Sequence, residues 1–157
     1  MKISILLCIA FFFFLNNPAI AQKNSISSSQ LNNQQIALIT AVVIKGNSVF
    51  ITTDFVQMLT GKSAIAAAKK TGEAEYDINK KKDTVWYVPN DYFVVNINKT
   101  LRQLQLTSDA VIYLVKEGGS TLVKSTIARL KNNFEGKLFK IHLLKNSIIK
   151  IEEIYTP

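Results

Sequence analysis

The stretch IALITAVVIKGNSVFITT, residues 36–53, decides the fold that we expect for this chain. Two β-branched, apolar runs flank the turn Gly46-Asn47, and this combination is typical of a β-hairpin. A second hairpin is predicted near the C-terminus, where residues 137–144 and 148–155 flank Lys145-Asn146-Ser147. Antiparallel hairpins at both ends of a domain, with helices between them, favour an α+β fold whose sheet curls on itself.

The segments between the two hairpins predict two helices and several short strands. Residues 62–70 are rich in Ala and are followed by Gly72, which predicts a helix and its C-terminal end. Apolar residues at helical spacing predict a second helix between Ser120 and Gly136. Further strands are expected at 84–88, 91–96, 101–106 and 110–115, and a polar loop at 73–83. We therefore expect an α+β domain with a small curled antiparallel β-sheet, or an OB-like partly open barrel, and two helices.

The N-terminus predicts export. Lys2 precedes the apolar run 3–15, and Ala19-Ile20-Ala21 has the small-x-small pattern that signal peptidase recognises. We predict cleavage between Ala21 and Gln22. Residues 1–21 are then a signal peptide, 22–34 a flexible polar tether and 35–157 a single globular domain. The apolar run is shorter than the roughly 20 residues that a transmembrane helix needs, so no such helix is expected in the mature chain.

The cysteine content and the net charge limit the kinds of function that are possible for this chain. The single cysteine, Cys8, lies inside the predicted signal peptide, so a mature chain has no disulfide and no thiolate nucleophile. The net charge of the full chain is +8. Such a charge attracts an exported protein to anionic lipid headgroups, lipopolysaccharide or teichoic acids, although simple solubility of a Lys-rich chain explains it too.

Gly61-Lys62-Ser63 raises the question of a nucleotide site. A Walker-type phosphate loop needs a glycine five positions before Gly61, and Val56 stands there. The surrounding sequence also lacks a βαβ pattern. Gly61-Lys62-Ser63 is explained by the start of the helix predicted at 62–70, so we expect no nucleotide-binding site there.

Several short motifs occur in a characteristic order. Residues 54–68 follow the pattern D-x-V-x-x-L-T-G-x-x-A-x-x-A-A. The later motifs are P-N-D-Y-F at 89–93, N-x-N at 96–98, L-R-x-L at 101–104 and I-E-E-x-Y-x-P at 151–157. Together they resemble a family of small exported bacterial proteins and lipoproteins, over most of residues 40–157. The resemblance implies a compact exported domain of unknown function and identifies no catalytic residue.

Polar side chains gather in one short segment that could bind a ligand. Within twelve residues the chain places Asp91, Tyr92, Asn96, Asn98 and Arg102, whose groups could orient a glycan or a peptide. Alternatively, Asp91 closes a turn, and Asn96 and Asn98 end a strand. Arg102 would then form an ion pair with an acidic side chain. Residues on one strand alternate between its faces, so a ligand would have to use the strand end.

Other chemistries have weaker signals. His142 is the only histidine, which excludes His-rich zinc sites and a Ser-His-Asp triad in the mature chain, and we expect it to be an ordinary strand residue. Three lysines at 80–82 lie near several aromatic residues, but nucleic acid is not expected as a partner. Asp83-Thr84-Val85 resembles a bacterial O-glycosylation motif, which makes Thr84 a potential glycosylation site.

These observations favour a binding function. We expect a monomeric, exported, non-catalytic binding or interaction module of the bacterial envelope or exterior, without cofactor or metal. Its ligand would be a polar or anionic polymer or a protein partner. The alternative is a small secreted hydrolase with a carboxylate pair, which would require two acids facing each other across a pocket.

Overall fold

The computed structural model describes residues 33–156. The predicted signal peptide, its cleavage site at Ala21 and Gln22, and residues 22–32 of the predicted tether lie outside the described residues. The elements, in chain order, are β1 (Gln34–Lys45), β2 (Ser48–Thr60), α1 (Gly61–Thr71), β3 (Glu75–Ile78), β4 (Thr84–Tyr87), the 3-10 turn η2 (Pro89–Asp91), β5 (Tyr92–Val95), β6 (Leu101–Val115), β7 (Leu122–Lys124), α2 (Ile127–Asn132), β8 (Leu138–Leu144) and β9 (Ser147–Glu153).

Both predicted hairpins are confirmed. In the first, Lys45 pairs with Ser48 across a two-residue turn, and Gly46 has a φ of 56°. The second hairpin joins β8 to β9 through Lys145 and Asn146, whose φ values are 48° and 65°. Backbones with positive φ at such short turns match the right-handed twist of the flanking strands.

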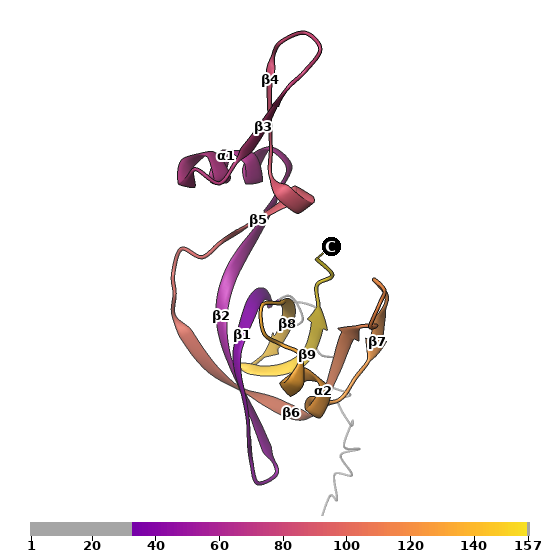
Figure 1. Ribbon diagram of the computed structural model, residues 1–157. Coiled ribbons are helices and arrows are strands. Elements are labelled where there is room, and N and C mark those ends of the chain that lie inside the picture. Colours follow the sequence, from indigo (N-terminus) through magenta and orange to yellow (C-terminus); the bar gives the residue numbers. More distant parts are fainter. Residues whose placement is uncertain (1–32, 157) are drawn as a thin grey trace, which may run out of the picture.

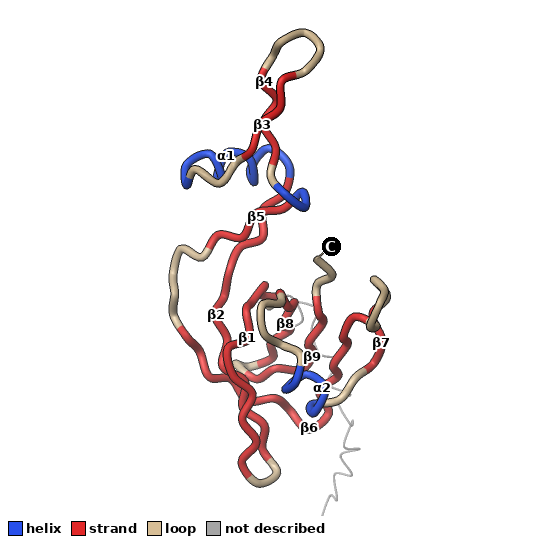
Figure 2. The backbone as a smooth tube through the Cα atoms, in the orientation of Figure 1, coloured by secondary structure: helices blue, strands red, loops and turns tan. Residues whose placement is uncertain are grey.

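The two hairpins are joined into a closed barrel (Figures 1 and 2). The strand order is β2-β1-β8-β9-β6, and β6 pairs again with β2, which closes the ring of five strands. The pair β6–β9 is parallel, while the other four pairs in the ring are antiparallel. The predicted barrel-like α+β architecture is thus confirmed in its coarse form, although strands dominate it. The expected antiparallel sheet or partly open barrel is instead a closed ring with one parallel pair, β6–β9. Strands β5 and β7 lie outside the ring.

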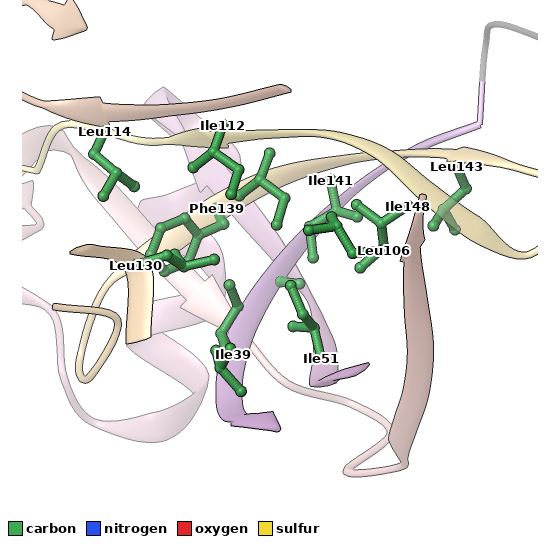
Figure 3. Packing of buried hydrophobic residues seen from close by; sticks show 13 residues of the cluster. Ile39, Ile51, Leu106, Ile112, Leu114, Leu130, Phe139, Ile141, Leu143 and Ile148 are labelled. Atoms are coloured by element: carbon green, nitrogen blue, oxygen red, sulfur yellow. The ribbon is translucent and has the colours of Figure 1, made fainter. Parts of the chain in front are cut away.

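The barrel interior contains the main apolar core. Fully or nearly fully buried side chains from β1, β2, β6, β8 and β9 meet there, and α2 adds Leu130. Figure 3 shows Leu130 beside Phe139 of β8, and both side chains have an exposed fraction of 0%. Removal of this apolar surface from water is the main favourable contribution to folding.

Strand β2 connects the barrel to a second, smaller unit. Its residues Val49–Asp54 pair with β6, whereas Gln57–Thr60 pair with β5. Residues 61–91 therefore form an insertion beyond the barrel, and Figure 1 shows α1 and the β3–β4 hairpin there. In this unit Ala64 and Ala68 of α1 are fully buried with Val88. Small side chains on α1 let the helix approach β5 closely.

Two local expectations were wrong. Residues 75–78, predicted as part of a polar loop, form β3 because they pair with β4 from Glu75–Tyr87 to Ile78–Thr84. The second helix is shorter than predicted, since Leu122–Lys124 instead form β7 and pair with the end of β6. In both places pairing between strands overrides the local sequence pattern.

Helix α2 begins after Thr126, whose Oγ1 accepts a hydrogen bond from the backbone N–H of Arg129. Such a cap satisfies one of the free N–H groups at a helix start. Neither of the two α-helices found in residues 33–156 is long and apolar enough to cross a membrane.

Candidate functional site

The structure divides the ligand cluster predicted at residues 91–102. Asp91 lies in η2 and lines a hollow of about 420 Å³ beside α1, together with Ile65 and Tyr87. Asn98 and Arg102 line a different hollow, of about 270 Å³, beside the C-terminal end of β5 at Val95. Tyr92 is half-buried and pairs with Thr60 in the β2–β5 ladder. The cluster is therefore not one continuous site.

Asn96 and Arg102 are used by the fold. Asn96 Nδ2 donates a hydrogen bond of 2.6 Å to Asp54 Oδ2, and Asp54 is only 7% exposed. The Arg102 guanidinium donates to the Thr100 carbonyl and lies 4.7 Å from the centre of the Phe55 ring. Both contacts fasten the β5–β6 connection to β2, which is the structural alternative to a ligand-binding role.

The largest hollow found among the described residues lies beside β6, between Asn47 of the β1–β2 turn and Ser147 at the start of β9. We call it the mouth pocket and define it by Asn47, Gln105, Thr107, Ser108, Ser125 and Ser147, which are among the residues that line it. Its volume is about 640 Å³. Volumes of 300–1,000 Å³ are typical of ligand pockets.

An irregularity in β6 opens the mouth pocket. Leu106 pairs with Ile148 of β9, but the next pair joins Val111 to Lys150, so β6 has three more residues than β9 between these two points. The extra residues bulge away from β9 and form one wall of the pocket. Bulges of this kind are frequent near binding and active sites.

The pocket wall contains hydroxyl groups without partners. Thr107 Oγ1 and Ser125 Oγ are inaccessible to solvent and have no hydrogen-bond partner among the described residues. Buried polar groups in native proteins are usually hydrogen-bonded, and each exception requires an explanation. Apolar side chains such as Val49, Val111 and Ile127 cover other parts of the same pocket. Exposed polar side chains such as Gln105 and Ser108 line the pocket as well, and together these surfaces suit a ligand that has both hydroxyl groups and apolar surface.

A second hollow lies at the opposite end of β9. Its volume is about 360 Å³, and Glu117 and Glu153 both line it, together with Lys137. Both oxygens of Glu153 are engaged: Oε1 lies 2.8 Å from Lys137 Nζ, and Oε2 accepts the backbone N–H of Val115 at 2.9 Å. These two contacts hold the Glu153 carboxylate in place, which indicates a structural role for it.

His142 belongs to a charged group on β8 and β9. Its Nε2 lies 2.6 Å from Glu152 Oε2, while Lys150 Nζ lies 2.9 Å from Glu152 Oε1. Partial burial alone would raise the pKa of Glu152, but hydrogen bonds and positive charge from Lys150 and His142 outweigh it and lower this pKa. Across residues 33–156 no three His, Cys, Asp or Glu side chains form a group that could hold a metal ion.

Sequence patterns alone did not reveal the mouth pocket. Its lining residues come from four segments that lie up to a hundred residues apart in the chain. One local signal was present, because Thr107-Ser108-Asp109 interrupts two apolar stretches. Thr84, the predicted glycosylation site, lies at the exposed start of β4, opposite Ile78.

No protein-family profile, curated protein or solved structure matches this chain. The function must therefore be inferred from the geometry of the mouth pocket and of the surfaces around it.

Proposed function

We propose that this protein is an exported, non-catalytic binding module of the bacterial envelope or exterior, and that it holds a polar ligand in the mouth pocket. The observation that carries the proposal is the position of this pocket. It lies between the β1–β2 turn at Asn47 and the start of β9 at Ser147, and β6 forms its wall.

The barrel connectivity supports an OB-type assignment. OB-folds are five-stranded, partly open Greek-key barrels that bind oligonucleotides and oligosaccharides on the face of their second and third strands, flanked by the first and last hairpin loops. Here β2 and β6 are the second and third strands of the ring along the chain. The mouth pocket is lined by Asn47 of the first hairpin turn and by Ser147, which directly follows the last one.

The chemistry of the pocket favours a glycan-like polar polymer. Exposed amide and hydroxyl side chains of Asn47, Gln105 and Ser108 can exchange hydrogen bonds with sugar hydroxyls, and Val49 and Ile127 can contact the apolar faces of sugar rings. The only charged side chain that lines the pocket among the described residues is Lys124, so an acidic sugar would also be accepted.

The alternative function, a hydrolase with a carboxylate pair, would have to use Glu117 and Glu153 in the smaller hollow. Glu153 is 7% exposed and is already bound by Lys137 and the Val115 N–H. This arrangement favours the binding module over the hydrolase, since a catalytic acid needs access to the substrate.

Thermal unfolding with a ligand panel tests the proposal. The chain from residue 22 onward, which contains every described residue, would be melted with muropeptides, lipopolysaccharide, heparin and neutral oligosaccharides. A ligand at 100 times its Kd stabilises the folded state by about 2.7 kcal/mol, which is a measurable increase in Tm. A shift that persists in added salt indicates specific binding.

Two variants link such a shift to the mouth pocket. Gln105→Ala and Ser108→Ala remove exposed polar side chains that line the pocket, so the Tm of the free protein should change little. The ligand-induced shift should fall in both. Gln103→Ala and Ser120→Ala, at exposed positions outside the lining, serve as matched controls. A panel without any shift, or equal losses in the controls, contradicts the proposal.

A further inference from the structure

The β3–β4 hairpin forms an arm that extends from the barrel (Figure 1). We define the arm as residues 75–87. Its two strands pair with each other and, within the described chain, with no other strand. The barrel core contains no residue of the arm. Because the arm extends from the barrel and contributes no residue to its core, we expect it to have a role other than stabilising the barrel.

The arm exposes large apolar side chains. Ile78 is 67% exposed, Tyr76 57% and Val85 48%. Pairs across the ladder place Tyr76 beside Trp86, with ring centres 5.0 Å apart. By strand alternation, Tyr76, Ile78 and Trp86 share one face of the hairpin and Val85 lies on the other, so apolar side chains are exposed on both faces of the arm. Exposed apolar surface of this extent is typical of segments that contact a partner or a membrane.

The tip of the arm has a defined structure and carries positive charge. Asn79 Oδ1 accepts the backbone N–H groups of Lys81 at 2.8 Å and Asp83 at 2.9 Å, and the Lys82 N–H donates to the Asn79 carbonyl. These bonds hold a turn that contains the three consecutive lysines 80–82, all exposed. The carboxylate of Asp83 is occupied by the Asn79 amide at 3.2 Å.

The remaining charges near the arm lie toward its base. Lys69 of α1 lies 4.2 Å from the centre of the Trp86 ring, and Glu75 accepts a hydrogen bond from the Tyr87 hydroxyl at 2.8 Å. Asp77, opposite Val85, is the acid on the arm that has no hydrogen bond or ion pair in the described structure. The end of the arm is thus cationic, with apolar and aromatic side chains directly behind it.

We propose that the arm docks the protein on a lipid surface whose headgroups carry anionic phosphates. Lysines close to such a surface are attracted to it, and Trp and Tyr favour the interface between headgroups and hydrocarbon. A soluble phosphate polymer would satisfy Lys80, Lys81 and Lys82 but would leave Ile78 and Val85 in water. A lipid interface accommodates both kinds of side chain.

Trp86 makes the docking directly observable, because it is the only tryptophan in the chain. The chain from residue 22 onward would be mixed with vesicles of phosphatidylglycerol and phosphatidylcholine, and with vesicles of phosphatidylcholine alone. We expect co-sedimentation and a blue shift of tryptophan emission with the anionic vesicles. Omission of residues 1–21 keeps the apolar run 3–15 out of the assay.

Two arm variants separate the contributions of charge and apolar surface. The triple variant Lys80→Gln, Lys81→Gln, Lys82→Gln should weaken binding by about 100-fold, since each lysine near an anionic surface contributes roughly a fivefold factor. The double variant Ile78→Thr, Val85→Thr preserves β-propensity and should weaken binding by about tenfold.

Matched controls change the same number of charges or apolar groups elsewhere. Lys116→Gln, Lys131→Gln, Lys145→Gln removes three exposed lysines from the barrel, and Ile44→Thr, Ile97→Thr removes two exposed apolar side chains. Both controls should bind vesicles nearly as the unchanged chain does.

Four outcomes would overturn the proposal. They are no binding to anionic vesicles, equal losses in control and arm variants, a double variant that binds as the unchanged chain does, and soluble polyphosphate that binds as tightly as the vesicles. The last two would identify the partner of the arm as a soluble anionic polymer.

Discussion

Asn96 donates a hydrogen bond of 2.6 Å to the nearly buried carboxylate of Asp54, and this contact joins the segment after β5 to the barrel strand β2. The remaining side-chain oxygen of each residue is buried without a partner among the described residues. The pair lies where β2 changes its partner from β6 to β5. It therefore holds the insertion in place against the barrel.

Asn96→Ala should destabilise the protein. Removal of the amide leaves the Asp54 carboxylate, 7% exposed, without its only hydrogen bond in the described structure. A hydrogen bond to a charged group contributes about 1.5–3 kcal/mol, and urea unfolding should show a loss of this size. Asn98→Ala, at an exposed position in the same segment, should cost less than about 0.5 kcal/mol. Equal effects of the two variants would refute the structural role of Asn96.

Leu130→Ala should be among the most damaging single changes. Leu130 is fully buried and is the side chain through which the short helix α2 enters the barrel core. Truncation leaves a cavity, and the expected loss is about 2–5 kcal/mol in the free energy of unfolding. Lys131→Ala on the exposed side of the same helix should change stability by less than about 0.5 kcal/mol.

Lys137 and Glu153 should be energetically coupled. Their contact of 2.8 Å joins the loop before β8 to the end of β9, and Glu153 is 7% exposed. Lys137→Ala leaves a buried carboxylate with one remaining donor, so a loss of about 1–3 kcal/mol is expected. In a double-mutant cycle, Lys137→Ala combined with Glu153→Gln should cost less than the sum of the single changes. Strict additivity would show that the contact contributes nothing.

Stability should fall in acid partly because of Glu152. Its pKa is lowered in the folded protein from the ordinary value of 4.5, so its contribution is present above that value. It is lost as the pH falls through the lower, folded-state pKa. The Glu152 side chain is 22% exposed, so solvent weakens its ion pair with His142. The contribution of Glu152 to the free energy of unfolding should therefore be roughly 0.2–1 kcal/mol. Urea unfolding at pH 7 and pH 3 should show a smaller difference for Glu152→Gln than for the unchanged chain.

Much of the local structure could be predicted from the sequence. The turn residues Gly46-Asn47 and Lys145-Asn146 mark the two hairpins, and Gly72, with a φ of 76°, ends α1 as expected. These features depend on the backbone preferences of a few neighbouring residues. By the same local reasoning, β3 was missed, because EYDI has no strand pattern of its own and forms a strand only when TVWY pairs with it.

The candidate site was predicted poorly because it depends on contacts between distant segments. Asp91 and Arg102 are close in the chain, but the path of β5 and of the loop that follows it places them at two different hollows. Asn47, Ser125 and Ser147 are far apart in the chain and yet line one pocket. Proximity in sequence was therefore a poor guide to proximity in space.

By itself, then, the sequence determined the hairpins, the first helix and the barrel-like class, because alternation, turn chemistry and helix ends act over a few residues. Only the tertiary structure decided that β6 pairs with both β2 and β9, and that pairing creates the closed ring and the irregularity that opens the mouth pocket. Closure of the ring requires pairing between strands that are far apart in the chain. It depends on which strands can share one core and one set of backbone hydrogen bonds, and no short segment contains that information.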